Sequence, residues 1–260
     1  MLRLTFDGGT LVLSGLVPPN ADNTDSTLPA ALVWDPRIER YRAPGYRYRE
    51  VAVWLKQGYV AANEVFPLRA RTDLWTAPEL REYQHAALLS WRAAHSSGLV
   101  VLPTGAGKTR LACAAMAAVR CAVFCLVPTR ALLHQWRDEI ARHYRGPVGC
   151  LGDGEHRIEH VTVATFEGGY RHMTRLGNRF GLLVVDEAHH FGAGVRDEAL
   201  EMSAAPLRLG LTVLSGLRVA ASRNGRALAT RDCRLLDTGV RTEEARGPSR
   251  GALRSAHRVH

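Results

Sequence analysis

A glycine-rich loop near the middle of the chain carries residues whose types and spacing suit the binding of phosphate groups. Residues 103–109 read Pro-Thr-Gly-Ala-Gly-Lys-Thr, and they lie between an apolar run and a helical pattern. Glycine permits a backbone path that points successive N–H groups at phosphate oxygens, and the N-terminus of the following helix favours negative charge. At this spacing Lys108 would reach the β- and γ-phosphates of a nucleoside triphosphate, and the Thr109 hydroxyl would ligate Mg²⁺.

Lys108 is unusual in this chain because almost every other basic residue is an arginine. Of the 34 basic residues only Lys56 and Lys108 are lysines. A lysine retained against that bias suits a position that needs a compact ammonium group and not a planar guanidinium. The first glycine of the common eight-residue loop pattern is absent, since Leu102 precedes Pro103. A glycine-rich turn without a ligand is the alternative, but the order of strand, loop and helix favours a phosphate-binding loop.

A second segment ends an apolar run in two adjacent carboxylates. Residues 182–190 read Leu-Leu-Val-Val-Asp-Glu-Ala-His-His. Asp186 would hold Mg²⁺ through water, and Glu187 would orient and deprotonate an attacking water. Two acids after a strand can also be plain surface charge, an alternative that the phosphate-binding loop disfavours. His189 and His190 raise the question of a zinc site, but we favour a polar coupling role for His189.

The surrounding pattern predicts the elements that must position these residues. Five short apolar runs alternate with helical stretches, which predicts a parallel sheet covered by helices on both faces. The runs are residues 99–102, 122–127, 161–164, 182–185 and 207–211. A helix over residues 79–95 should bury one face, formed by Leu80, Tyr83, Ala87, Leu88 and Trp91.

The first 70 residues predict a separate, small α+β domain. Residues 2–6 and 10–14 alternate around a Gly-Gly pair, which indicates a β-hairpin, and residues 31–34 predict a short strand. Pro44 could begin a helix that runs to about residue 57 and buries Val51, Trp54 and Leu55. We therefore expect a small domain over residues 1–70, a nucleotide-binding domain over 71–212 that begins with a linker, and a basic, disordered tail over 213–260.

Composition limits the classes of protein and of partner. The net charge of +9 and the pI near 9.8 suit a polyanion such as nucleic acid, although many basic proteins bind none. The chain has an odd number of cysteines, five, and none are spaced Cys-x-x-Cys. This pattern supports neither a disulfide framework nor a zinc site, so we expect reduced thiols. The sequence has no apolar run long enough to predict a membrane span, and its N-terminus has no signal-peptide core. We therefore expect a cytoplasmic protein.

The two motifs together resemble those of superfamily 2 helicases of the DEAH-like type. Residues 80–84, Leu-Arg-Glu-Tyr-Gln, resemble the motif whose glutamine hydrogen-bonds adenine, and residues 127–136 and 163–167 resemble motifs Ia and Ib, which contact nucleic acid. The resemblance implies a RecA-like domain that uses ATP and Mg²⁺, with coupling by His189 and Thr212. The implied ATP-binding residues are Gln84, Arg81, Thr104, Gly105, Ala106, Gly107, Lys108 and Thr109. The implied nucleic-acid contacts are Thr129, Arg130 and Thr165.

Within the superfamily the resemblance is strongest to the xeroderma pigmentosum group B type of DNA helicase. The Leu-Arg-x-Tyr-Gln motif and the pair His189-His190 fit that type, as does a small domain before the motor, which in that family resembles a damage-recognition module. The resemblance implies an ATP-dependent helicase or translocase that acts on DNA, with a separate second motor lobe or a repair protein as candidate partners. Restriction-type translocation subunits share many of these motifs and remain an alternative.

The resemblance breaks at the end of the last apolar run. The family continues Leu-Gly-Leu-Thr-Ala-Thr-Pro, whereas here residues 209–212 are followed by Val-Leu-Ser-Gly. The Ala-Thr pair that couples hydrolysis to strand movement is missing, and no second RecA-like domain follows. We hypothesise a truncated or frame-shifted product that alone binds ATP weakly and hydrolyses it very slowly. A non-catalytic protein that binds nucleic acid or a partner is the alternative from another class.

Overall fold

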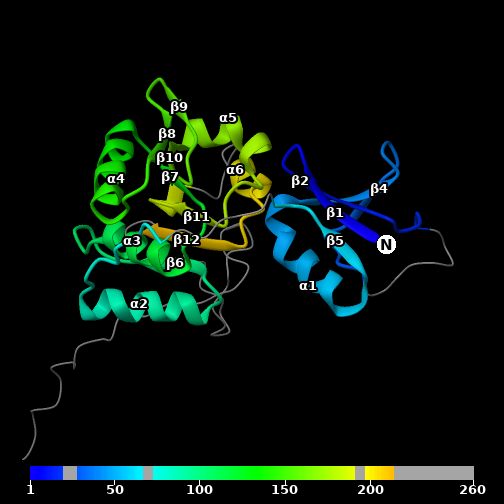
Figure 1. Cartoon of the computed structure of the whole chain (residues 1–260), viewed down its shortest axis with the longest axis horizontal. Helices are drawn as coiled ribbons and strands as arrows, with labels where there is room; N and C mark the ends of the chain where they lie inside the picture. Colours follow the sequence, from blue (N-terminus) through cyan, green and yellow to red (C-terminus); the bar gives the residue numbers. More distant parts are fainter. Residues whose placement is uncertain (20–27, 67–72, 191–196, 214–260) are drawn as a thin grey trace, which may run out of the picture.

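In a computed structural model of the chain, two sheets form the frame of the protein (Figure 1). The structure describes residues 1–19, 28–66, 73–190 and 197–213. The expected boundary between residues 70 and 71 lies outside the described residues, as does the expected tail over residues 213–260 apart from Val213. Within the described ranges, no helix is both long enough and apolar enough to cross a membrane.

The small sheet has the strand order β3-β4-β2-β1-β5 and packs one helix against its apolar face. Its strands are β1 (Leu2–Asp7), β2 (Thr10–Ser14), β3 (Val33–Asp35), β4 (Arg40–Pro44) and β5 (Ala61–Asn63). The β1–β2 hairpin is confirmed, with both turn glycines at positive φ. The strand expected at 31–34 begins later, because the Leu32 N–H donates to the Pro29 carbonyl and closes a turn.

The helix expected after Pro44 is confirmed, with a tighter first turn than predicted. A 3₁₀ turn, η1 (Gly45–Arg47), leads into α1 (Tyr48–Gly58). Val51, Trp54 and Leu55 are buried in the core of the small domain, as their helical spacing predicted.

The large sheet has the strand order β6-β12-β11-β7-β10-β8-β9 and is parallel except for β9. Its strands are β6 (Ser97–Val101), β7 (Val123–Val127), β8 (Val148–Gly152), β9 (Glu155–Arg157), β10 (Val161–Thr165), β11 (Leu182–Val185) and β12 (Leu207–Thr212). The five expected strands are all present. The sequence pattern missed β8 and β9, because β8 contains two glycines and β9 is short, polar and exposed.

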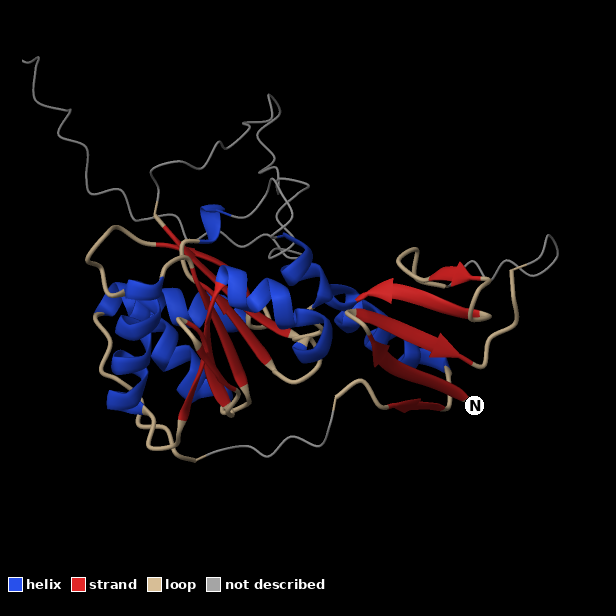
Figure 2. Ribbon diagram, turned by 90° about the horizontal axis from the view of Figure 1, so that it is seen from above, coloured by secondary structure: helices blue, strands red, loops and turns tan. Residues whose placement is uncertain are grey.

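Helices cover both faces of this sheet, as expected (Figure 2). The helices of the domain are α2 (Glu82–Ala93), α3 (Lys108–Val119), α4 (Arg130–His143), α5 (Phe166–Leu176), η2 (Ala188–His190) and α6 (Asp197–Met202). Side chains of α2, α3 and α4 pack in one core layer, and those of α5 and α6 pack in the other. Tyr83 was expected on the buried face of α2 but is 41% exposed, because it lies in the first turn beside the phosphate-binding loop.

The small domain meets the large one around the end of α6. The Asn178 side chain donates a hydrogen bond of 2.7 Å to the Val65 carbonyl across this contact. A side chain at Gly45 would place its Cβ 2.5 Å from the Met202 carbonyl oxygen, so only glycine allows the two backbones to approach this closely. Ala204, just after α6, is buried in the core of the small domain.

Candidate functional site

The residues predicted to bind phosphate and metal meet at one edge of the large sheet. The loop follows β6, the two acids follow β11, and Thr212 ends β12. These three strands are neighbours in the sheet, with Thr212 paired to Val101 and Val185 paired to Gly210. Since the carboxyl ends of parallel strands share one edge, three segments that are distant in the sequence form one site.

Two glycines give the phosphate-binding loop its path. Gly105 and Gly107 lie at φ +78° and +76°, in the left-handed region that favours glycine. Gly107 is also the residue that precedes the first turn of α3, so the loop leads directly to the positive end of that helix. A Cβ at Gly107 would lie 2.5 Å from Nε2 of Gln84, so a side chain at this position would displace the Gln84 amide.

Gln84 is buried beneath this loop and holds it to the start of α2. Its Oε1 accepts a hydrogen bond of 2.9 Å from the Arg81 N–H, and its Nε2 donates to the Ala106 carbonyl at 2.8 Å. The Tyr83 hydroxyl donates to the same carbonyl at 3.0 Å and accepts from the Arg81 guanidinium at 3.2 Å. Sequence reasoning missed this contact of Tyr83, and its place in the Leu-Arg-x-Tyr-Gln motif was the available signal. The adenine-binding role of Gln84 and Arg81 stays a prediction.

A chain of charged and polar groups crosses the site from the loop to β12. The Lys108 Nζ lies 3.7 Å from Oε1 of Glu187, and Oε2 of Glu187 lies 3.4 Å from Nδ1 of His189. The same imidazole nitrogen lies 3.0 Å from the Thr212 hydroxyl. The predicted coupling residues His189 and Thr212 are therefore in contact, although coupling itself stays a prediction.

Glu187 has a strained backbone and a buried carboxylate oxygen, two features that are common in functional residues. Its φ is +47°, in a region that a non-glycine residue adopts at a cost of roughly 1–3 kcal/mol. Its Oε2 atom is buried and accepts no hydrogen bond from the residues that the structure describes. A buried acceptor without a donor is costly unless a further group supplies one, which suits a base that awaits a water.

Asp186 is 5% exposed, and each of its oxygens accepts one hydrogen bond from the protein. The indole N–H of Trp136 donates to Oδ2 at 2.9 Å, and the Glu187 N–H donates to Oδ1 at 3.0 Å. Burial raises the pKa of Asp186; the Trp136 hydrogen bond opposes this shift and the Glu187 charge adds to it. Sequence reasoning named Trp136 only as the end of the segment that resembles motif Ia and gave it no role at this site; in the structure it packs in the core with Leu133 and Ile140.

The oxygen donors at this edge suit a Mg²⁺ ion that is shared with a nucleotide better than a metal ion that protein side chains alone would hold. Thr109, Asp186 and Glu187 offer a hydroxyl and carboxylates, which are the ligands that a hard cation prefers. Across the described part of the chain, no group of three or more His, Cys, Asp and Glu side chains is arranged to hold a metal ion. Mg²⁺ is usually held by one or two carboxylates together with substrate phosphates, so this donor set fits an ion shared with a nucleotide.

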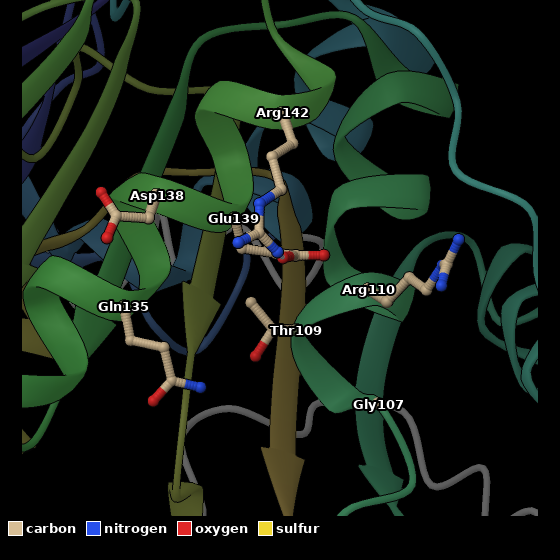
Figure 3. A pocket seen from close by; sticks show the side chains of 7 residues that line it. All are labelled: Gly107, Thr109, Arg110, Gln135, Asp138, Glu139 and Arg142. Carbon is tan, nitrogen blue, oxygen red and sulfur yellow. Dashed lines mark hydrogen bonds and ion pairs between the residues drawn. The ribbon is translucent and has the colours of Figure 1, made fainter.

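An open pocket of about 580 Å³ lies beside the loop, between α3 and α4. It is lined by Gly107, Thr109, Arg110, Gln135, Asp138, Glu139 and Arg142. Figure 3 shows the Thr109 side chain directed from the start of α3 toward α4, on the side where Gln135 lies. The candidate Mg²⁺ ligand Thr109 therefore faces open space and not the protein core.

The residues predicted to contact nucleic acid lie at the same edge, at the carboxyl ends of β7 and β10. The Thr129 hydroxyl accepts from the Leu132 N–H at 3.2 Å, and the Thr165 hydroxyl accepts from the Gly168 N–H at 3.1 Å. Both hydroxyls therefore cap helix N-termini, of α4 and α5. Arg130 has a side chain that is 76% exposed, but a carboxylate oxygen of Asp153 lies 3.4 Å from its guanidinium.

The β8–β9 hairpin supplies acids to this part of the edge. Oδ2 of Asp153 lies 2.9 Å from Nε2 of His134, and Glu155 pairs with Arg137 at 2.8 Å. The hydrogen bond with His134 is the main cause that holds the pKa of Asp153 below its usual value, and the charge of Arg130 adds to it. Basic side chains of α4 are therefore partly neutralised from within the chain.

Known proteins with similar sequences support these motifs. Residues 77–214 match the family model described as type III restriction enzyme, res subunit, and residues 4–64 match the xeroderma pigmentosum group B helicase damage recognition domain. DNA 3'-5' translocase XPB2 of Sulfurisphaera tokodaii is 33% identical over 187 residues, which are 70% of this chain and 41% of that protein. DNA 3'-5' helicase XPB of Mycobacterium tuberculosis is also 33% identical over 187 residues, 65% of this chain and 33% of that protein.

The likeness covers less than half of either relative. Among solved structures, the UvsW helicase of bacteriophage T4 aligns with a TM-score of 0.45 and 16% identity, over 81% of this chain and 91% of that chain. The res-subunit model spans more than half of the 260 residues and includes both the phosphate-binding loop and the acidic motif. The chain therefore belongs to the superfamily 2 helicases, in the family of the type III restriction enzyme res subunit, and it resembles the xeroderma pigmentosum group B type.

Proposed function

We propose that residues 71–212 form the first motor domain of an ATP-dependent DNA helicase or translocase, which binds ATP with Mg²⁺ and hydrolyses it. The observation that carries the proposal is the 3.7 Å approach of Lys108 to Glu187. It brings the phosphate-binding loop and the acidic motif together in one site, beside the buried Asp186 carboxylate.

Each side chain of the site would have a separate task. Lys108 and the loop N–H groups would bind the β- and γ-phosphates, and Glu187 would orient the attacking water and accept its proton. Thr109 and Asp186 would hold Mg²⁺, which when bound neutralises charge on the phosphates. The pair His189 and Thr212 would couple the site to the end of β12, since their 3.0 Å contact joins the acidic motif to that strand.

DNA is the partner that the charge and the relatives favour. The chain carries a net charge of +9, and the two relatives described above are named as a DNA translocase and a DNA helicase. Arg130 is exposed at the start of α4, where a helix N-terminus also favours a phosphate. Those names describe the full-length relatives, of which this chain spans less than half. The proposal therefore includes a second motor lobe as a partner in catalysis.

The test is ATP turnover by the purified chain, with and without single-stranded and forked DNA. The matched controls are Lys108→Ala and Lys56→Ala, because these are the two lysines of the chain and Lys56 lies on α1 of the small domain. We expect slow turnover that DNA stimulates, that Lys108→Ala removes and that Lys56→Ala leaves unchanged. Turnover that survives in Lys108→Ala would contradict the assigned site.

A protein that binds nucleic acid without an ATP cycle is the second candidate. It is favoured by Val213, which follows Thr212 where the family has the alanine of its coupling motif. If this candidate is right, neither the addition of ATP nor the Lys108→Ala substitution should change the affinity for DNA. DNA affinity that changes when ATP and Mg²⁺ are added would exclude it.

A further inference from the structure

Trp136 lies one residue beyond the pocket-lining Gln135 but points away from the pocket, into the core. It is fully buried near the middle of α4, and it packs in the same core layer as Leu133, Ile140 and Val184. Its indole N–H donates a hydrogen bond of 2.9 Å to Oδ2 of Asp186, the first acid after β11. The contact therefore joins a helix on one face of the sheet to the edge where the nucleotide site lies.

Two donors fix the plane of the Asp186 carboxylate. Trp136 donates to Oδ2, while the Glu187 N–H donates to Oδ1 at 3.0 Å. Each carboxylate oxygen can accept about two hydrogen bonds or ligand contacts, so the described residues leave one position on each oxygen available. A carboxylate held in this way has little rotational freedom left to lose when it receives a cation or a cation-bound water.

A second buried tryptophan shows what a structural role requires. Trp91 on α2 is 3% exposed, and its indole N–H donates to the Arg208 carbonyl at 2.9 Å. A buried indole N–H needs an acceptor, and a backbone carbonyl satisfies it. Trp136 instead donates to the carboxylate that is the candidate Mg²⁺ ligand.

We infer that Trp136 is a positioning residue, which holds the Asp186 carboxylate in the orientation that receives Mg²⁺. This inference rests on the proposed function, because it assigns Asp186 to the metal. It goes further by giving a residue of the core face of α4 a role in metal affinity. Partners that orient metal ligands in this way typically contribute about 10–100-fold to the affinity for the metal.

The test measures how binding of a fluorescent ATP analogue to the full chain depends on the concentration of Mg²⁺. Trp136→Phe removes the donor, and Trp91→Phe is the matched control, since it also removes a buried indole donor. Replacement of Trp136 by benzothienylalanine, which keeps the size of the indole and lacks the N–H, guards against a loss of packing in the phenylalanine variant. Thermal unfolding of each variant reports on folding independently of the nucleotide.

Both Trp136 replacements are expected to raise the half-saturating Mg²⁺ concentration by about tenfold or more, with nucleotide binding in EDTA unchanged. Trp91→Phe is expected to leave that concentration unchanged. Wild-type Mg²⁺ dependence in the benzothienylalanine protein would overturn the inference and leave the proposed function standing, as would an equal shift in Trp91→Phe. Nucleotide binding by the wild-type protein that does not depend on Mg²⁺ would overturn the proposed function and the inference together.

Discussion

The two halves of the carboxyl edge of the large sheet differ in how their polar groups are held. After β6, β11 and β12, the key side chains are largely buried and contact one another, with Asp186 5% exposed and Lys108 3.7 Å from Glu187. After β7 and β10, Arg130 is exposed and the hydroxyls of Thr129 and Thr165 bond to their own helices. We call these, after the functions proposed for them, the nucleotide half and the nucleic-acid half of the edge.

The difference separates a fixed site from an adaptable surface. Groups that must act on one atom are best held in place before the ligand arrives, which the nucleotide half does with buried hydrogen bonds. Contacts to a phosphate backbone position a long polyanion without reading one atom, so exposed arginines and helix N-termini suffice. Substitutions in the first half should therefore act on chemistry, and those in the second on stability and on salt-dependent binding.

The largest effect is expected for Glu187→Gln in the nucleotide half. The amide cannot accept the proton of the attacking water, so single-turnover hydrolysis with excess protein should fall by roughly 10²–10⁴-fold. Binding of ATP should be retained, because Lys108 and the loop are unchanged. Equal hydrolysis by the variant and the wild-type protein would remove Glu187 from the role of base.

The capping threonines should contribute to stability whether or not nucleic acid is present. Thr129→Ala and Thr165→Ala should each lower the free energy of unfolding by ~1 kcal/mol, because each removes an acceptor for a helix N–H. Serine at either position should restore most of the loss. Thr174, which is exposed within α5, is the matched control. Urea unfolding of the five variants measures the effect, and an equal cost at Thr174→Ala would show that capping is not the cause.

Arg130→Ala should weaken DNA binding by a small factor and leave nucleotide binding unchanged. One lost phosphate contact should reduce the slope of log affinity against log salt by about 1 and lower affinity about three- to fivefold at moderate salt. Arg92→Ala removes the same charge from the exposed face of α2 and serves as the control. Fluorescence anisotropy at several salt concentrations measures both quantities. A loss that is the same in the two variants would reflect net charge alone.

The smallest effect is expected for Asp153→Asn, and it should depend on pH. The pKa of Asp153 is held below its usual 3.8, chiefly by His134, so the carboxylate stabilises the fold above that pH and loses its contribution as the pH falls through the lowered value. The variant should be slightly less stable than the wild-type protein at pH 7, with a difference that closes in acid. Asp138→Asn, on the exposed side of the same α4, is the control for lost charge. Chemical unfolding at several pH values should show a gap that narrows toward acid for Asp153→Asn; a gap independent of pH would contradict the assignment.

The sequence predicted the nucleotide half better than its surroundings. The loop and the two acids each follow an apolar run that predicted a strand. Because the carboxyl ends of parallel strands share one edge, the local pattern predicted that Lys108 and Glu187 lie close together. The contact of Trp136 with Asp186 spans 50 residues and could not be predicted, since helical spacing distinguishes a buried position from an exposed one but not the partner of a buried indole. The β8–β9 turn was missed for a related reason, because its residues are glycine and polar and show no period.

The central claim is that the nucleotide half binds ATP with Mg²⁺. Isothermal titration calorimetry of the protein with ATP in the presence of Mg²⁺ tests it most directly. The wild-type protein and Lys56→Ala are expected to bind with the same affinity. Lys108→Ala is expected to bind at least roughly tenfold more weakly, because it removes a charged partner of the phosphates. Equal affinity in Lys108→Ala, or no binding by the wild-type protein, would contradict the claim.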